Sequence, residues 1–305
     1  MDGLVWHERP LLDRPVLLVA MAGWSDAGNA ATAAASLLVT QRQGRRFAEI
    51  PPHDFYVFTV VRPWVRQNPD GSRRIEWPVS TFYALPDPAG ATDLVVLIGT
   101  EPSLRWAQFS RLVLELAQTL AVRHVLTLGA YLGDVRHFEP PPVSGWTSDE
   151  AVRARFRPLR IDPITYEGPT AYITTLGVAC AEAGLPVTAL WTALPSYLGP
   201  TPNPKGALAL LQAVDRLFAL GLDLRDLEQS ARRFETEVTR LLLRRQREAT
   251  SAPREPAPRE TAAPEPPAGR ETPPTPELSG PPDLPSPQEA VREVEDFLRR
   301  LREEQ

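Results

Sequence analysis

A strand, a glycine turn and an alanine-rich helix follow one another early in the chain. The apolar run 17–22 is typical of a buried strand, Gly23 ends it, and a helix is expected over about 27–38. This order is the opening unit of an α/β sheet, in which ligands bind beyond the carboxyl ends of the strands. The turn after residue 22 is therefore the first place to look for function.

The same alternation continues along the chain. Buried or β-branched runs predict strands at 55–61, 79–84, 93–99, 124–130 and 187–194, and apolar periodicity predicts helices at 104–120, 171–183, 205–220 and 223–247. The turn sequence 68–71 predicts a hairpin whose returning strand is 73–77, and 143–165 has no regular pattern. Together these elements predict an α/β fold with a mostly parallel sheet and helices on both faces.

The first glycine turn does not fit a phosphate site. Gly23 and Gly28 have the spacing of a G-x-x-x-x-G loop, but Asn29 follows where such a loop needs Lys. Asp26 would also repel a phosphate. The dinucleotide pattern G-x-G-x-x-G fails because Ser25 occupies its second glycine position.

The turn also nearly reads as a G-x-S-x-G nucleophile elbow. Ser25 would then be the nucleophile, and His137 with Asp134 would complete a triad. The local alternative is that Ser25 and Asp26 cap the helix by accepting bonds from its first N–H groups. We favour the cap.

Several further residues could carry chemistry at the strand exits. Asp26, Glu101, Glu167 and His137 could converge in one pocket, where a carboxyl pKa would rise and the imidazole could act as a general base. Each also has a local explanation, such as a cap or a surface turn. Their spacings match no metal motif, so no metal and no cofactor are expected.

Composition narrows the classes of function. The 305 residues carry a net charge of −5, which argues against a nucleic-acid partner. The single cysteine, Cys180, cannot form an internal disulfide, as expected of a protein of the cytoplasm. No run of eighteen apolar residues occurs, so no membrane span is expected.

The last fifth of the chain changes character. Residues 1–248 read as one α/β domain, 249–285 as a disordered proline-rich linker, and 286–305 as an amphipathic tail helix. The tail helix is too small to be stable alone, so it should dock on its own domain, on another subunit or on a protein client. The long helix before the linker carries an apolar stripe that fits either its own domain or a subunit contact.

The chain also carries a series of short motifs, in this order: Gly23-Trp24-Ser25-Asp26-Ala27-Gly28, Arg62-Pro63, Ile75-Glu76-Trp77-Pro78, Gly99-Thr100-Glu101-Pro102-Ser103, Leu128-Gly129-Ala130, Tyr166-Glu167-Gly168-Pro169-Thr170 and Asn203-Pro204-Lys205. Spread over residues 15–245, they resemble the proteasome assembly chaperone family in its bacterial branch, which is related to the second eukaryotic assembly chaperone. Ser25 and Ser196 depart from the residues common in that family, Asn and His respectively.

The resemblance implies an α/β fold similar to nucleoside phosphorylases and self-association into homo-oligomers, a trimer being one candidate form. It implies no established activity. We therefore expect a self-associating, assembly-chaperone-like interaction protein of unknown client. The alternative is a hydrolase or phosphorylase-like enzyme that uses a strand-end pocket formed by Asp26, Glu101, His137 and Glu167.

Overall fold

The structure is a computed structural model that describes residues 3–87 and 92–251. Residues up to Arg240 form one compact unit, and of the second unit, 241–305, only the end of a helix is described. Positions 249–251 belong to that helix. The rest of the predicted linker 249–285 and the whole predicted tail helix 286–305 lie outside the described residues.

Within residues 3–87 and 92–251, nine strands form one sheet and two form a separate hairpin. The strands are β1 (Val5–Trp6), β2 (Val16–Ala22), β3 (Arg45–Ile50), β4 (Trp64–Gln67), β5 (Arg73–Glu76), β6 (Ser80–Leu85), β7 (Leu94–Thr100), β8 (His124–Gly133), β9 (Val143–Thr147), β10 (Ile161–Pro163) and β11 (Val187–Pro195).

The large sheet has the order β1-β3-β6-β7-β2-β8-β11-β9-β10. Its four central strands, β7, β2, β8 and β11, are parallel, as their continuous apolar runs predict. On one side β6, β3 and β1 pair antiparallel, and on the other β9 runs antiparallel to β11. The parallel core brings the carboxyl ends of β2, β7, β8 and β11 to one edge.

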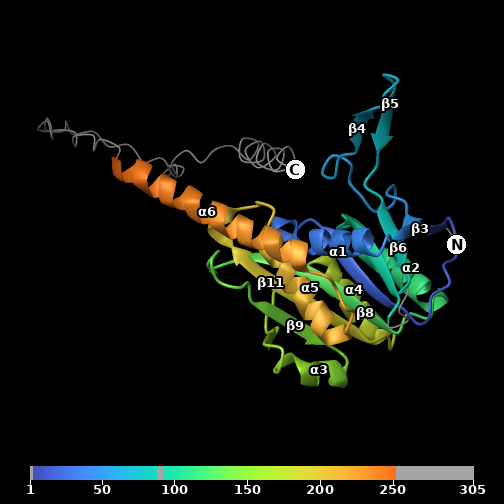
Figure 1. The fold of residues 1–305 in the computed structure, drawn as a ribbon. Helices are drawn as coiled ribbons and strands as arrows, with labels where there is room; N and C mark the ends of the chain where they lie inside the picture. Colours follow the sequence, from blue (N-terminus) through green and yellow to red (C-terminus); the bar gives the residue numbers. More distant parts are fainter. Residues whose placement is uncertain (1–2, 88–91, 252–305) are drawn as a thin grey trace, which may run out of the picture. The chain divides into compact units, whose positions relative to one another are not determined.

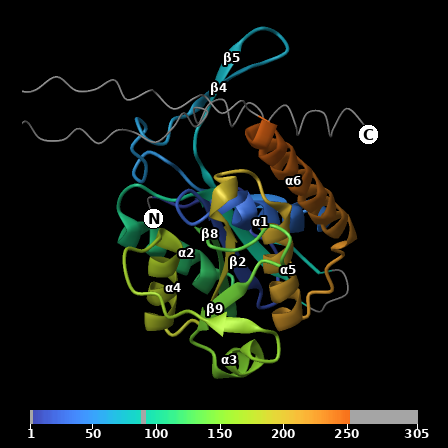
Figure 2. The same ribbon diagram turned by 90° about the vertical axis from the view of Figure 1, so that its left-hand side faces the viewer.

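The helices are α1 (Ala30–Gln41), α2 (Trp106–Thr119), α3 (Glu150–Phe156), α4 (Tyr172–Glu182), α5 (Pro204–Phe218) and α6 (Arg225–Ser251), with short 3-10 turns η1 (Ala27–Asn29) and η2 (Ser196–Leu198). Helices α1 and α5 cover one face of the sheet and α2 and α4 the other (Figures 1 and 2). The predicted fold class, an α/β sheet with helices on both faces, is confirmed.

The alternation along β2 explains the two cores. Leu17, Val19 and Met21 pack against α2 and α4, whereas Val16, Leu18 and Ala20 face α1 and α5. Apart from Val16, at 1%, none of these six side chains is exposed to solvent. A strand whose side chains are apolar on both faces is unfavourable where it would be exposed to solvent. Strand β2 therefore lies at the centre of the sheet.

The strand predicted at 55–61 is wrong. These residues form turns, in which Phe55 bonds back to Pro52, and Val60 and Val61 bond back to Val57. The run is apolar because Phe55 and Tyr56 are buried against the core. The hydrophobicity of residues 55–61 reflects a loop that is buried against the core. Periodicity alone cannot distinguish such a buried loop from a strand.

The stretch 143–165 is more regular than its sequence indicates. It contains β9, α3 and β10, and β3 was likewise not predicted. These elements are short or charged. Two of them pair with strands far away in the sequence, β9 with β11 and β3 with β6. Tertiary contacts override weak local patterns in such segments.

The apolar stripe of α6 packs on its own domain. Leu224, Ala231, Phe234 and Val238 are each less than 10% exposed within the single chain. Of the two interpretations of this stripe, intramolecular packing is therefore the one the structure supports for residues up to Val238.

Candidate functional site

The loops after β2, β7, β8 and β11 meet at the carboxyl edge of the central strands. The parallel register of these strands brings the loops together. Just beyond the end of β2, Asp26 forms an isolated parallel bridge with Ala130 of β8. A Cβ built on Gly23 would lie 3.2 Å from Cβ of Glu101, so the first two loops are in contact. The loops after these strands therefore share one edge of the sheet.

Asp26 caps helix α1. Its Oδ1 accepts hydrogen bonds from the N–H groups of Ala31 (2.8 Å) and Thr32 (3.2 Å), and its Oδ2 accepts one from the Thr32 hydroxyl (2.5 Å). Burial raises the pKa of this carboxyl, and the bonds from Thr32 and Ala31 oppose that shift. Both oxygens are thus already engaged at the start of the helix.

Ser25 does not form a triad. Its side chain is fully buried, and its Oγ has no hydrogen-bond partner among the described residues. Asp134, the predicted acid of the triad, is exposed in the loop after β8 and makes no recorded bond to His137. The hydroxyl lacks the base that a serine nucleophile requires.

Glu101 caps helix α4, on the opposite face of the sheet from α1. Its Oε1 accepts a 2.7 Å hydrogen bond from the N–H of Tyr172, the first residue of α4. A carboxylate at a helix N-terminus stabilises the unsatisfied N–H groups there. Asp26 and Glu101 therefore perform the same structural task for two helices on opposite faces.

His137 is held by three elements. Its Nδ1 lies 2.7 Å from the hydroxyl of Tyr197, and its Nε2 lies 2.9 Å from the hydroxyl of Thr239 in α6. Thr239 donates its only hydroxyl hydrogen to the Glu235 carbonyl, so it must accept from His137 Nε2–H. The same accounting makes the Tyr197 hydroxyl the donor to Nδ1, and it accepts the His137 backbone N–H.

This arrangement favours a neutral imidazole. Burial lowers the pKa of His137, the positive charge of Lys205 lowers it further, and Glu235 acts in the opposite direction. A proton on Nδ1 would face the Tyr197 hydroxyl, which already donates to that nitrogen. His137 is therefore a connector between loops and α6.

Lys205 completes the connection and is the one strongly placed residue that sequence reasoning did not select. Its ammonium is buried at the start of α5, donates to the His137 carbonyl and forms an ion pair with Glu235 of α6 (2.5 Å). Its signal in the sequence was that it is the only lysine of the chain. Buried charges are found paired because an unpaired one is costly to desolvate.

The remaining predicted residue, Glu167, is exposed in the loop before α4. Within residues 3–87 and 92–251, no hydrogen bond joins any two of Ser25, Asp26, Glu101, His137 and Glu167. The loops that carry them share one edge of the sheet, but the polar groups that bond there satisfy local partners.

The same loops also expose large apolar side chains. We call the following side chains the strand-end rim: Trp24, Leu104, Tyr131, Leu132, Phe138, Tyr166 and Tyr197. All seven are between 45% and 65% exposed, and they lie in or beside the loops that follow β2, β7, β8 and β11 and precede α4. Groups of exposed large apolar residues mark interaction surfaces more often than catalytic ones.

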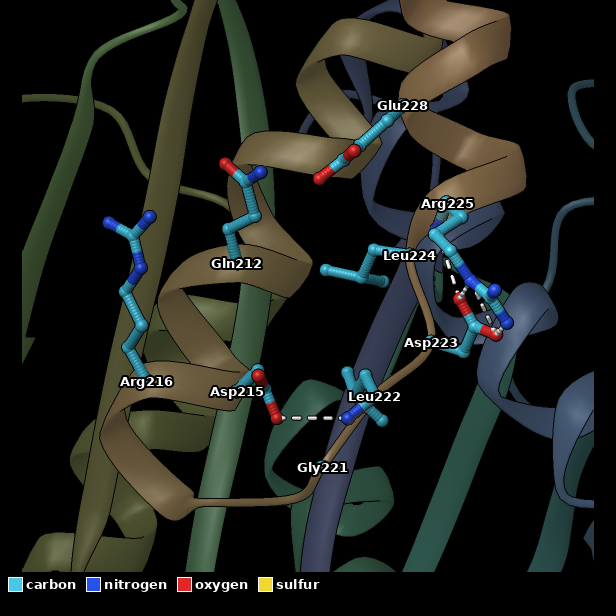
Figure 3. Close-up of a pocket in the computed structure, with 9 residues that line it drawn as sticks. All are labelled: Gln212, Asp215, Arg216, Gly221, Leu222, Asp223, Leu224, Arg225 and Glu228. Carbon is cyan, nitrogen blue, oxygen red and sulfur yellow. Dashed lines mark hydrogen bonds and ion pairs between the residues drawn. The ribbon is translucent and has the colours of Figure 1, made fainter.

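A cavity of about 550 Å³ lies elsewhere, between the end of α5 and the start of α6 (Figure 3). There Asp215 accepts from the Leu222 N–H, and Asp223 pairs with Arg225. Gln41, at the end of α1, donates to the Asp223 carbonyl, which places this cavity at the amino ends of the strands. It is therefore remote from the rim.

Among the described residues, no group of His, Cys, Asp or Glu side chains could hold a metal ion. Over the same ranges, no helix is both long and apolar enough to cross a membrane.

Residues 20–242 match the model of the PAC2 family. A PAC2 family protein from Streptomyces avermitilis is 39% identical, with a TM-score of 0.70 over 74% of this chain and 95% of that one. A proteasome-assembly chaperone homologue from Mycobacterium tuberculosis is 35% identical, with a TM-score of 0.68 over 74% and 94%.

More distant structures share the fold alone. PbaB of Pyrococcus furiosus, an archaeal proteasome activator, is 20% identical, with a TM-score of 0.63 over 79% of this chain and 99% of that one. None of the curated proteins compared with the chain matches it.

Proposed function

The chain belongs to the PAC2 family, as its motifs predicted, and from this premise we propose that it is a self-associating protein with an assembly-chaperone-like role. Its client is a protein. Proteasome subunits are the first candidates, because similar proteins include a proteasome-assembly chaperone homologue and a proteasome activator. It acts in the cytoplasm.

One observation carries the proposal: the strand-end rim exposes large apolar side chains beside polar groups that are already satisfied. Trp24 and Tyr166 are each more than 60% exposed, whereas Asp26 and His137 at the same edge of the sheet are each less than 10% exposed. An enzyme needs groups free to reach a substrate, and a protein-binding surface needs apolar area to bury. The rim provides the second.

The enzyme alternative makes a different demand on the same residues. A hydrolase or phosphorylase-like enzyme would need Asp26 and His137 within reach of a common substrate. Their present bonds to Thr32, Tyr197 and Thr239 would have to break first. This makes the interaction role the better supported of the two.

The test compares three forms of the chain in affinity capture from native lysate. The double variant Trp24→Ser and Phe138→Ser removes two exposed rim side chains, and Val178→Ser removes an equally exposed apolar side chain from the outside of α4. The unchanged chain and the Val178 variant should retain the same proteins, and the rim variant should retain at least tenfold less.

A parallel capture with residues 249–305 removed tests the proposed domain division and the tail helix as a client contact. A client lost only on that truncation would assign binding to the tail. Equal capture by the rim variant and the unchanged chain would contradict the proposed role of the rim. A small ligand whose binding is lost in Asp26→Asn, with the fold retained, would favour the enzyme.

A further inference from the structure

The hairpin formed by β4 and β5 lacks the cover that such a hairpin needs. It stands away from the nine-stranded sheet (Figures 1 and 2), and every residue of both strands is exposed. A two-stranded hairpin is at best marginally stable in water, and its stability needs a packed face. We call residues 62–77 the hairpin arm.

The arm is anchored at its base only. Trp77 packs on Phe58 and His53, with ring centroids 4.9 and 5.0 Å apart. The loop that carries Phe58 is in turn fixed where the Phe55 carbonyl accepts the N–H groups of Ser103 and Leu104. The base is thus rigidly attached beside the strand-end rim, and the arm extends beyond it.

Register divides the arm into two unlike faces. Trp64 lies opposite Glu76 and Arg66 opposite Arg74, so these four share one face. There Arg66 pairs with Glu76 (2.7 Å) and lies 5.1 Å from the ring of Trp64. The side chains of Trp64, Arg66 and Glu76 on this face are therefore already in contact with one another.

The other face is apolar and uncovered. Val65 lies opposite Ile75, and the two are 57% and 52% exposed. Arg73 lies on the same face beside Gln67, and it makes no ion pair among the described residues. This face therefore presents two exposed β-branched side chains beside an arginine that makes no ion pair with the described part of the chain. It fits a partner surface that is apolar and has acidic residues at its edge.

The arm is basic as a whole. It carries four arginines against two acids, in a chain whose net charge is −5. The rim has the opposite character, because Asp134, Glu139 and Glu167 are exposed there and make no ion pair among the described residues. Two exposed arginines lie in the same loops: Arg105 pairs with Asp54, and Arg136 lies over the ring of Phe138. Apolar side chains of the rim, such as Phe138 at 53% exposure, lie next to the acids of the rim in the chain.

The arm and the rim therefore match each other in charge and in apolar character, and both lie at the carboxyl edge of the sheet. We propose that the hairpin arm of one copy packs its Val65–Ile75 face against the strand-end rim of a second copy. This inference rests on the self-association proposed above and specifies how it occurs.

The contact joins two different surfaces of the chain, and each copy offers one arm and one rim. Two copies related by a two-fold axis can exchange arms and make the contact twice, and a larger ring makes it once at each interface.

The experiment is a charge swap measured by light scattering coupled to size-exclusion chromatography. The arm variant is Arg73→Glu with Gln67→Glu, two changes on the Val65–Ile75 face, and the rim variant is Asp134→Arg with Glu139→Arg. Each should weaken association at least tenfold through like-charge contact. A chain carrying all four changes should regain association to within about threefold.

A mixture of the two variants gives a sharper readout. In the mixture the intact arm of the rim variant can bind the intact rim of the arm variant, and the swapped arm can bind the swapped rim. The two variants should therefore co-assemble in alternation, although neither associates alone. Arg111→Glu with Arg157→Glu, two exposed arginines on other parts of the surface, is the matched control and should assemble like the unchanged chain. Thermal unfolding of every variant checks that the core is intact.

The outcomes separate the two proposals. A monomeric unchanged chain would refute self-association itself. A stable oligomer that both variants leave unaltered would refute only the arm-to-rim contact, and loss of client capture from the arm variant with the oligomer intact would assign the arm to the client instead. Failure of the four-change chain to reassociate would also overturn the proposed pairing.

Discussion

The ammonium of Lys205 is buried between the His137 carbonyl and the carboxylate of Glu235. This contact ties the start of α5 to α6 and to the loop after β8. It also lies beside the His137 imidazole and lowers the pKa of that ring. One cation thus fixes the position of a helix and adds to the effect of burial, which is the larger cause of the lowered pKa of His137.

Replacing Lys205 with Met should lower the free energy of unfolding by about 1–3 kcal/mol, because it leaves a buried carbonyl without its donor. Urea denaturation measures the change. Arg153→Met is the control: Arg153 pairs with Glu150 at the surface, so its loss should cost less than about 0.5 kcal/mol. Equal effects of the two changes would argue against a special role for Lys205.

His124 predicts an acid-sensitive fold. Its Nε2 lies 2.8 Å from the Thr188 hydroxyl, and burial lowers its pKa from the ordinary histidine value of 6.5 to about 4. Because the unfolded chain binds the proton more readily, stability is complete above pH 6.5 and is lost as the pH falls toward 4. The loss should reach about 3 kcal/mol.

The check is the unfolding free energy of the unchanged chain and of His124→Gln, measured between pH 7 and 4. The amide can still donate to Thr188 but does not titrate, so the difference between the two curves should shrink or reverse in acid. His137 titrates in the same direction in both proteins and cancels from the difference. Parallel curves would show that His124 does not control this transition.

Gly28 should not tolerate a side chain. Its φ of +56° is a conformation that L-residues rarely adopt, and an added Cβ would lie 2.9 Å from the Thr201 carbonyl. Gly28→Ala should therefore cost about 2–4 kcal/mol from backbone strain and overpacking together.

Gly184→Ala separates the two causes. Gly184 also has a positive φ, of +74°, but its added Cβ would meet no atom within 4 Å. This control should cost only about 1 kcal/mol. If Gly28→Ala is no worse than Gly184→Ala in thermal denaturation, the close contact with the loop before α5 is not tight.

The imidazole of His137 should be neutral and carry its proton on Nε2. Long-range proton–nitrogen NMR spectra at pH 7 report this tautomer directly. Tyr197→Phe removes the donor to Nδ1 and should lower stability by about 1 kcal/mol. A proton found on Nδ1 would contradict the hydrogen-bond assignment through Thr239.

Most of the α/β framework could be predicted from the sequence. The buried runs of β2, β7, β8 and β11 are long and apolar on both sides, and only the centre of a two-layered core accommodates them. Helix α5 was equally clear, because Asn203 and Pro204 form a cap whose bonds to Lys205 and Gly206 are purely local. The family was recognisable for the same reason, since its motifs are the turns between these elements.

The short elements and the role of each polar residue were decided by tertiary structure. Phe55 is buried in a loop rather than a strand because the Ser103 and Leu104 N–H groups need its carbonyl. The sequence placed Asp26, Glu101 and His137 at one edge of the sheet, but it could not say that each would be used by Thr32, Tyr172 and Tyr197. Such partners are chosen by side-chain direction across contacts distant in the chain, which no local pattern encodes.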